Sequence, residues 1–320
     1  MSEVKVALAL GSGAARGWSH IGVIKALEEM GVRINMVAGT SIGSLVGAGY
    51  ASGRLAEIEQ WVQGMNRWEV FNLLDFGFNH GGIIGGEKVF NRAREEFGQR
   101  NIEDLPITYG AVATDLYSGR EIWLREGDLY DASRASCAMP GVLSPKSFDG
   151  RWLIDGGLVN PVPVSLCRAL GADFVIAVHL NSQLNSKALQ RRGRSIPPQT
   201  EAEQLEKEKA DMEVQDNENG FFDNMWSGSK EYLDSFKERF RNNGEKAPGM
   251  FSVMASSIDI MQERITKARM AGDPPDILVQ PKLGMEFYRG QEAIDLGYET
   301  TTRMRDLIME EIDLYRERRG

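Results

Sequence analysis

Short apolar runs alternate with segments of helical periodicity along the first half of the chain. Residues 19–30 carry apolar side chains at helical spacing, and Gly31 is a typical helix stop. Residues 42–52 are rich in glycine, alanine and serine, which predicts a helix packed closely against a sheet. Strands that alternate with helices predict an α/β fold with a mostly parallel sheet covered on both faces. The runs that predict its strands are 4–10, 34–38, 107–113, 121–124, 151–154, 174–180 and 277–280.

The pattern changes between residues 183 and 249. Residues 187–200 hold four basic side chains and no acid, and residues 201–220 hold eight acids against two lysines. Residues 221–240 form an amphipathic helical pattern, which predicts either a helix docked on the core or a membrane-surface helix. We therefore expect one discontinuous domain, 1–182 with 250–320, and an insertion at 183–249. The insertion is a candidate lid, membrane-surface segment or partner-binding segment.

Composition narrows the functional classes. The chain has 320 residues, 42% of them hydrophobic, which is ordinary for a globular protein with a sizeable core. Only two cysteines are present, which excludes a disulfide scaffold and fits a cytoplasmic protein. The net charge of −9 argues against a nucleic-acid partner. No apolar run approaches the length of a membrane span, so we expect at most peripheral contact with the inner membrane through residues 221–240. A homo-oligomer stays a candidate assembly.

A glycine-rich loop follows the first predicted strand: Gly11-Ser12-Gly13-Ala14-Ala15-Arg16-Gly17. A dinucleotide-binding loop would need a third glycine at position 16, which is Arg16, and an acid after the second strand, which is absent. A tight structural turn stays open as the simpler interpretation. Backbone N–H groups in such a loop, beside the start of a helix, are suited to stabilising an anion.

A second motif, Gly39-Thr40-Ser41-Ile42-Gly43, lies between a predicted strand and a predicted helix. This G-x-S-x-G pattern is typical of a sharp turn that exposes a nucleophilic serine hydroxyl. An ordinary α/β-hydrolase triad fits poorly. In that fold several strands precede the nucleophile and a catalytic histidine follows it, whereas Ser41 follows only two strands and the chain has only three histidines in all. We expect His20 to be structural, assign no role to His80, and keep His179 as a lesser catalytic candidate.

A third motif, Asp155-Gly156-Gly157, follows the predicted strand 151–154. It is either a structural turn or a carboxylate at a strand end, where active sites of parallel sheets collect. In the second case Asp155 supplies the base that Ser41 needs, giving a Ser–Asp dyad without an imidazole. A carboxylate is a weak base, so this dyad favours ester over amide substrates.

Together these motifs resemble the patatin-like phospholipase family. The order matches: a glycine-rich loop that ends in Arg-Gly, then G-x-S-x-G, then Asp-Gly-Gly. The stretches Ala135-Ser136-Cys137-Ala138-Met139-Pro140-Gly141 and Asn160-Pro161-Val162-Pro163 also look like family blocks. The resemblance covers about 4–181, resumes near 254–304, and is greatest to the bacterial subgroup named for RssA. It implies a three-layer α/β/α fold with a mostly parallel central sheet.

The resemblance also implies the roles of the site residues. Ser41 is the implied nucleophile and Asp155 its base. Gly39 and Gly43 belong to the nucleophile elbow, and Gly156 and Gly157 to the Asp motif. The implied oxyanion hole is formed by the backbone of Ser12, Gly13 and Ala14, aided by Arg16. One departure concerns this loop, because many relatives carry three consecutive glycines where this chain has Ser12-Gly13-Ala14.

The main functional hypothesis is a serine acyl hydrolase of lipid esters that works through an acyl-enzyme. It requires no metal and no cofactor, and no clustered histidine and cysteine spacing predicts a metal site. Two alternatives stay open. One is an acyltransferase that uses the same serine with a lipid or coenzyme-A acceptor in place of water. The other is a regulatory or scaffold protein of the same fold with weak activity, in which the charged insertion binds a partner.

Overall fold

The computed structural model describes residues 4–64, 87–181, 250–282 and 290–319. The chain divides into two compact units, 1–185 with 258–320, and 186–257. The expected insertion at 183–249, including the amphipathic stretch 221–240, lies outside the described residues, as does His80. The first unit holds every strand in the described ranges and every site residue discussed below.

The first unit alternates strands and helices along most of its length. In chain order the described elements are β1 (Val6–Leu10), the 3₁₀ turn η1 (Ala14–Trp18), α1 (Ser19–Glu29), β2 (Ile34–Thr40), α2 (Ile42–Ala51), α3 (Leu55–Gly64), α5 (Glu87–Phe97), η2 (Ile102–Asp104), β3 (Thr108–Asp115), β4 (Glu121–Leu124), α6 (Leu129–Ser136), β5 (Lys146–Phe148), β6 (Arg151–Asp155), η3 (Gly156–Leu158), α7 (Val164–Ala169), β7 (Phe174–Val178), α11 (Met250–Gly272), β8 (Ile277–Val279), α12 (Gly290–Arg303) and α13 (Arg305–Arg319).

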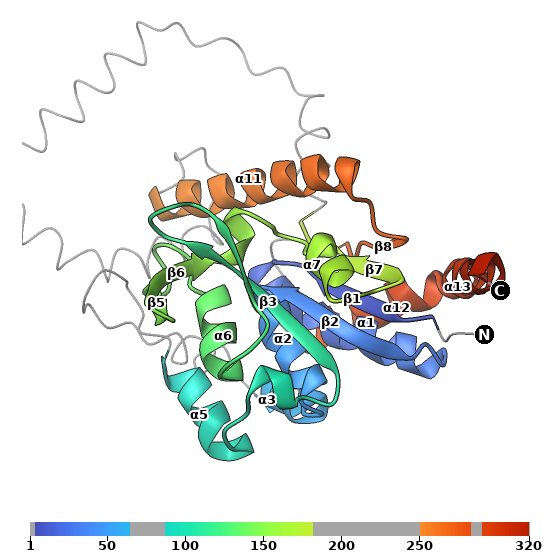
Figure 1. The fold of residues 1–320 in the computed structure, drawn as a ribbon, viewed down its shortest axis with the longest axis horizontal. Coiled ribbons are helices and arrows are strands. Elements are labelled where there is room, and N and C mark those ends of the chain that lie inside the picture. Colours follow the sequence, from blue (N-terminus) through green and yellow to red (C-terminus); the bar gives the residue numbers. More distant parts are fainter. Residues whose placement is uncertain (1–3, 65–86, 182–249, 283–289, 320) are drawn as a thin grey trace, which may run out of the picture. The chain divides into compact units, whose positions relative to one another are not determined.

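The strands form one eight-stranded sheet in the order β5-β6-β3-β2-β1-β7-β8, with β4 paired to β3 (Figure 1). The pairs along β3-β2-β1-β7-β8 are all parallel, whereas β4, β5 and β6 join by antiparallel pairs. The expected α/β architecture with a mostly parallel sheet is therefore confirmed. The short strand β5 and the antiparallel end of the sheet were not predicted.

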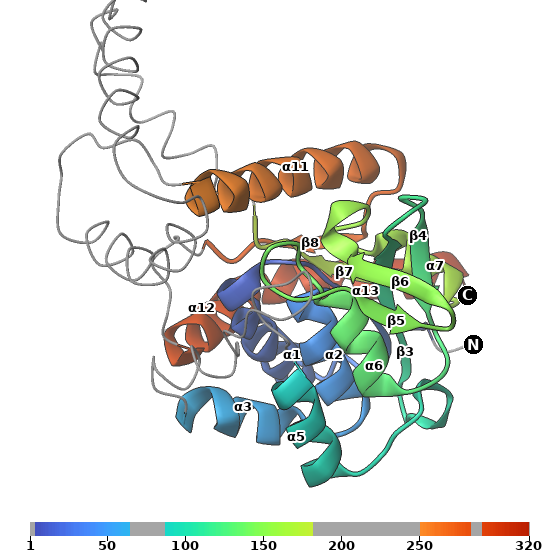
Figure 2. The same ribbon diagram turned by 90° about the vertical axis from the view of Figure 1, so that its left-hand side faces the viewer.

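Helices lie on both sides of the sheet (Figure 2), and the residues of β1 are buried on both faces. They alternate: Leu8 and Leu10 enter the core shared with α1, α2, α6, α12 and α13, whereas Ala7 and Ala9 enter the core shared with α7. The alanines leave little side-chain volume on the second face, so α7 can pack close to the strands. Helices on both faces of this sheet give the three layers α/β/α.

The sheet register brings the two candidate groups, the Ser41 hydroxyl and the Asp155 carboxylate, close together. Thr40, which precedes Ser41, is paired with Val112 of β3, and Asp155 is paired with the next residue, Ala113. Asp155 therefore ends an antiparallel strand rather than a parallel one, which corrects the expectation drawn from the strand ends of parallel sheets. The antiparallel pairing of β6 with β3 places its last residue beside the end of β2.

No helix in the described ranges combines the length and the apolar character that crossing a membrane requires.

Candidate active site

Ser41 occupies the sharp turn between β2 and α2. Its backbone angles are φ 56° and ψ −127°, in a region that a residue with a side chain enters only under strain. The turn closes because Gly39 and Gly43 lack side chains: a Cβ on Gly39 would collide with the Gly43 carbonyl, and a Cβ on Gly43 would collide with the Leu10 carbonyl. The strand–turn–helix setting expected for the G-x-S-x-G motif is present, with α2 starting directly after Ser41.

The Ser41 hydroxyl is bonded directly to Asp155. Ser41 Oγ donates to Asp155 Oδ2 at 2.6 Å, and both residues are buried, with exposed fractions of 6% and 1%. The other carboxylate oxygen, Oδ1, accepts the backbone N–H of Gly157 at 2.7 Å. The Asp155 backbone is also held, because Thr114 Oγ1 donates to its carbonyl at 2.8 Å. The carboxylate is thus fixed in one orientation toward the serine.

Burial changes the acidity of this carboxylate. It raises the pKa of Asp155 to about 6, while the hydrogen bonds from Ser41 and from the Gly157 N–H act in the opposite direction. Asp155 is therefore mostly ionised at neutral pH, yet it is a stronger base than an exposed aspartate. A base whose pKa lies near the working pH is the kind that general base catalysis requires.

The back of the Ser41 turn is supported by α6. Ser136, the last residue of that helix, accepts the Ser41 N–H on its hydroxyl oxygen at 2.9 Å. The same hydroxyl donates to the Val112 carbonyl at 2.6 Å. Ser136 therefore ties the strained turn to the neighbouring strand β3, and the position of α6 bears directly on Ser41.

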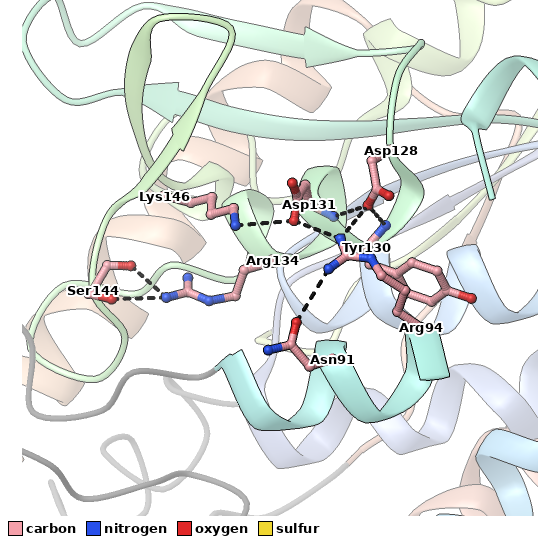
Figure 3. Close-up of polar contacts among 8 residues, drawn as sticks. All are labelled: Asn91, Arg94, Asp128, Tyr130, Asp131, Arg134, Ser144 and Lys146. Carbon is pink, nitrogen blue, oxygen red and sulfur yellow. Dashed lines mark hydrogen bonds and ion pairs between the residues drawn. The ribbon is translucent and has the colours of Figure 1, made fainter. Parts of the chain in front are cut away.

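Polar contacts hold α6 on both sides (Figure 3). Asp128 caps the helix by accepting the N–H groups of Tyr130 and Asp131 at 3.0 and 2.8 Å. Arg94 of α5 reaches across and pairs with both carboxylates, at 2.8 Å from Asp128 and 3.0 Å from Asp131. The buried Arg134 donates to the carbonyl and hydroxyl of Ser144, each at 3.0 Å. These contacts fix the helix that carries Ser136.

The glycine-rich loop presents two backbone amides beside the site. The Ser12 N–H donates to the Pro161 carbonyl at 2.8 Å, so it is already used and cannot also serve an oxyanion. This corrects the expectation for Ser12. Among the described residues nothing accepts the N–H groups of Gly13 and Ala14, and Ala14 has a positive φ of 48°. These two amides are the remaining donors of the expected oxyanion hole.

Arg16 holds this loop from the side. Its Nε donates to the Gly13 carbonyl at 3.1 Å, and its Nη2 pairs with Asp259 of α11 at 3.0 Å. Two of the three guanidinium nitrogens are therefore engaged by protein atoms. Arg16 was expected to aid the oxyanion hole, and in the structure its Nε fixes the Gly13 peptide.

An apolar cavity of about 60 Å³ lies among α2, α3, α5 and α6. Leu45 and Ala48 line it from α2, one and two turns after Ser41, and Trp18 lines it from the end of the glycine-rich loop. Trp61 and Phe90 contribute aromatic surface. The lining is almost entirely apolar, and one of its residues, Leu45, follows Ser41 by one helical turn.

Comparison with known proteins places these features in a family. The model of the patatin-like phospholipase family matches residues 8–168, which include the glycine-rich loop, Ser41 and Asp155. The chain belongs to the patatin-like phospholipase family. The narrower RssA-type subgroup stays a prediction.

Proteins of bacteria and animals are similar to this member of the family. An uncharacterized NTE family protein of Mycobacterium tuberculosis is 35% identical over 92% of this chain and 90% of its own length. The human patatin-like phospholipase domain-containing protein 6 is 40% identical over 56% of this chain but only 13% of its own length. The Drosophila melanogaster protein neuropathy target esterase sws is 35% identical over 56% of this chain and 13% of its own length. The chain thus resembles nearly all of the bacterial protein and a small part of the animal ones.

The described histidines of this family member do not contact Ser41 Oγ. His20 Nε2 lies 2.8 Å from the Gly11 carbonyl oxygen, and complete burial lowers the pKa of His20 to about 4, in keeping with a structural role. His179 Nε2 lies 2.9 Å from Glu263 of α11, and burial also lowers the pKa of His179. Within the described ranges no three histidine, cysteine or acidic side chains gather as a metal site.

Sequence reasoning did not find the α11 residues that reach the site. Asp259 bonds Arg16, and Gln262 accepts the Ser12 hydroxyl at 2.8 Å. No short motif surrounds either residue, and both are more than 240 positions from their partners. In the structure Gln262 is a polar residue at a buried helix position, which the sequence alone does not reveal.

Proposed function

We propose that this protein is a serine acyl hydrolase that cleaves carboxylic esters of lipids through a Ser41–Asp155 dyad. The observation that carries the proposal is the 2.6 Å hydrogen bond from the strained, buried Ser41 to a carboxylate with a raised pKa. A serine is a weak nucleophile unless a base lies within hydrogen-bond distance, and Asp155 is that base here.

In the first step Ser41 Oγ attacks the acyl carbon, and its proton passes to Asp155 Oδ2. The carbonyl oxygen becomes an oxyanion, which accepts the N–H groups of Gly13 and Ala14. The intermediate collapses as the carbon–oxygen bond to the alcohol breaks, and the leaving oxygen takes the proton from Asp155. The acyl group stays on Ser41 as an ester.

In the second step water replaces the alcohol. Asp155 takes a proton from the water as its oxygen attacks the acyl carbon, and the same two amides again accept the oxyanion. The bond to Ser41 Oγ then breaks, Ser41 recovers the proton from Asp155, and the free acid leaves. Each proton is returned, so the dyad ends as it began.

Two features support lipid esters as the substrate class. The apolar cavity begins beside Leu45, one turn after the nucleophile, and can accept the first carbons of an acyl chain. A relative is named neuropathy target esterase, and the family is named for phospholipases. A Ser–Asp dyad is also better matched to an ester than to an amide, because an alkoxide leaves with little help whereas an amine must be protonated before the carbon–nitrogen bond breaks.

The test is labelling with a fluorophosphonate, followed by intact-mass spectrometry and peptide mapping. We expect one adduct, located on Ser41, that is absent from Ser41→Ala and strongly reduced in Asp155→Asn. The matched control is Asp115→Asn, which changes another buried carboxylate, one that bonds Ser118 at the end of β3. An adduct on a different residue, or equal labelling of Asp155→Asn and wild type, would refute the dyad.

A further inference from the structure

Helix α11 contributes one side chain that touches both loops of the site. Gln262 belongs to the part of the helix within the first unit, and only 2% of it is exposed. Its Oε1 accepts two hydrogen bonds, from Ser12 Oγ at 2.8 Å and from Asn181 Nδ2 at 2.9 Å. The acceptor half of this amide is therefore used twice, once to hold the glycine-rich loop through Ser12 and once to hold Asn181.

The donor half of the same amide is not used. Among the described residues Gln262 Nε2 has no hydrogen-bond acceptor, although it is completely buried. A buried N–H group without an acceptor destabilises the folded state, and proteins rarely keep one without a functional reason. A residue needed only for packing and for holding Ser12 would not require this donor.

The position of the unused donor points to the reacting groups. A Cβ added to Gly157 would collide with Gln262 Nε2 and would lie 2.9 Å from Asp155 Oδ1. The amide nitrogen therefore lies next to the loop that holds the Asp155 carboxylate, while its own oxygen holds the oxyanion loop. Because Gly157 has no side chain, the same small space borders both Gln262 Nε2 and Asp155 Oδ1.

We propose that Gln262 is a third hydrogen-bond donor to the substrate, with Nε2 donating to an oxygen of the ester that is being cleaved. This inference rests on the proposed acyl hydrolase function. Gly13 and Ala14 supply backbone donors from one side, and Gln262 supplies a side-chain donor from the Asp155 side. The substrate oxygen supplies the acceptor that the described protein does not.

Three substitutions separate this role from a purely structural one. Gln262→Met keeps the shape and removes both halves of the amide. Gln262→Glu keeps an acceptor oxygen for Ser12 and Asn181 but replaces the donor. Ser12→Ala removes only the hydrogen bond that holds the loop. The matched control is Thr266→Val, a buried position one turn later whose hydroxyl bonds only the Gln262 backbone carbonyl at 2.8 Å.

The measurements are the rate of fluorophosphonate labelling at Ser41, kcat and KM with a soluble ester, and the melting temperature of each variant. Loss of one oxyanion-type donor typically lowers kcat ~100-fold. We expect such a loss in Gln262→Met and Gln262→Glu with little change in KM, a smaller loss in Ser12→Ala, and none in Thr266→Val. We expect Gln262→Met to melt lower than Ser12→Ala, because it leaves both Ser12 Oγ and Asn181 Nδ2 without their acceptor, so the rates are compared at a temperature at which every variant is folded.

The outcomes are distinguishable. Wild-type activity in Gln262→Glu, or equal losses in Gln262→Met and Ser12→Ala with no further loss in the double variant, would overturn the donor role and leave a loop clamp. Absence of labelling in the wild type would refute the proposed hydrolase and this inference with it. Labelling of the wild type with a selective kcat loss in both Gln262 variants would support both.

Discussion

The two turns that meet at Ser41 are held in different ways. The β2–α2 turn depends on its own glycines, Gly39 and Gly43, which let the chain close tightly beneath the serine. The loop after β1 depends on α11 instead, because Ser12 and Arg16 are bonded to residues 250 and 243 positions later in the chain. The turn of the proposed nucleophile is thus made possible by its own glycines and supported by Ser136 of α6, whereas the loop of the proposed oxyanion donors is held by α11. A change in α11 can therefore alter the loop after β1 without disturbing the β2–α2 turn.

Gly43→Ala should break the local turn and have the largest effect. The added Cβ would collide with the Leu10 carbonyl, and neither backbone can yield without moving β1 or α2. We expect a loss of roughly 3 kcal/mol or more in the free energy of unfolding, measured by chemical denaturation, together with loss of Ser41 labelling. The control is Gly272→Ala, where an added Cβ meets nothing within 4 Å. Normal stability and labelling in Gly43→Ala would contradict this account of the turn.

Asp155→Asn should raise the free energy of unfolding, because it removes a buried negative charge. It should also abolish activity, because the amide cannot act as a base. Because burial raises the pKa of Asp155 to about 6, its neutral form is favoured in the folded state, and stability is lost as the pH rises through that value. The Asn variant does not titrate, so we expect it to exceed wild type by roughly 3 kcal/mol at neutral pH and by much less near pH 4. Denaturation at a series of pH values measures the difference. A constant difference across the range would show that the carboxylate is not buried in this way.

The activity of the wild type should follow the same ionisation. Asp155 acts as a base only when ionised, so kcat/KM should rise with pH and level off above about 6. A pH–rate profile with a soluble ester measures this. A profile that is flat from acidic to neutral pH would argue against Asp155 as the base.

Asp259→Asn should affect only the loop positioned by the tertiary structure. It weakens the ion pair to Arg16, whose Nε fixes the Gly13 carbonyl. We expect kcat to fall ~10-fold with a change of less than ~1 kcal/mol in stability, because the pair is near the surface, with side chains 12% and 20% exposed. The control is Glu299→Gln, which breaks a more exposed Arg303–Glu299 pair on α12. Equal effects of the two substitutions would show that Asp259 does not act on the loop.

Ala48→Leu should have the smallest effect and should depend on the substrate. Ala48 lines the apolar cavity on α2, and a larger side chain would fill part of its volume of about 60 Å³. We expect kcat/KM to fall several-fold, ~1 kcal/mol, for long-chain esters and to change little for an acetate ester. The acetate ester is the internal control. An equal loss for both esters would show that the cavity does not hold the acyl chain.

Much of this arrangement was predictable because it is encoded in short segments. The glycines around Ser41 and after Asp155 mark turns that only residues without side chains allow, and apolar runs mark the central strands. The antiparallel pairing of β6 was not predictable, because the direction of a strand in the sheet depends on the tertiary contacts that decide which strand it pairs with. The use of the Ser12 N–H by Pro161 and the approach of Asp259 and Gln262 depend on distant contacts that leave no local pattern.

The most direct test of the central claim is capture of the acyl-enzyme. Wild-type protein mixed rapidly with a chromogenic long-chain ester, quenched in acid and analysed by peptide mass spectrometry should carry the acyl mass on the Ser41 peptide. Ser41→Ala should carry no adduct and show no turnover. Turnover that persists in Ser41→Ala, or an acyl adduct on another residue, would contradict the Ser41–Asp155 mechanism.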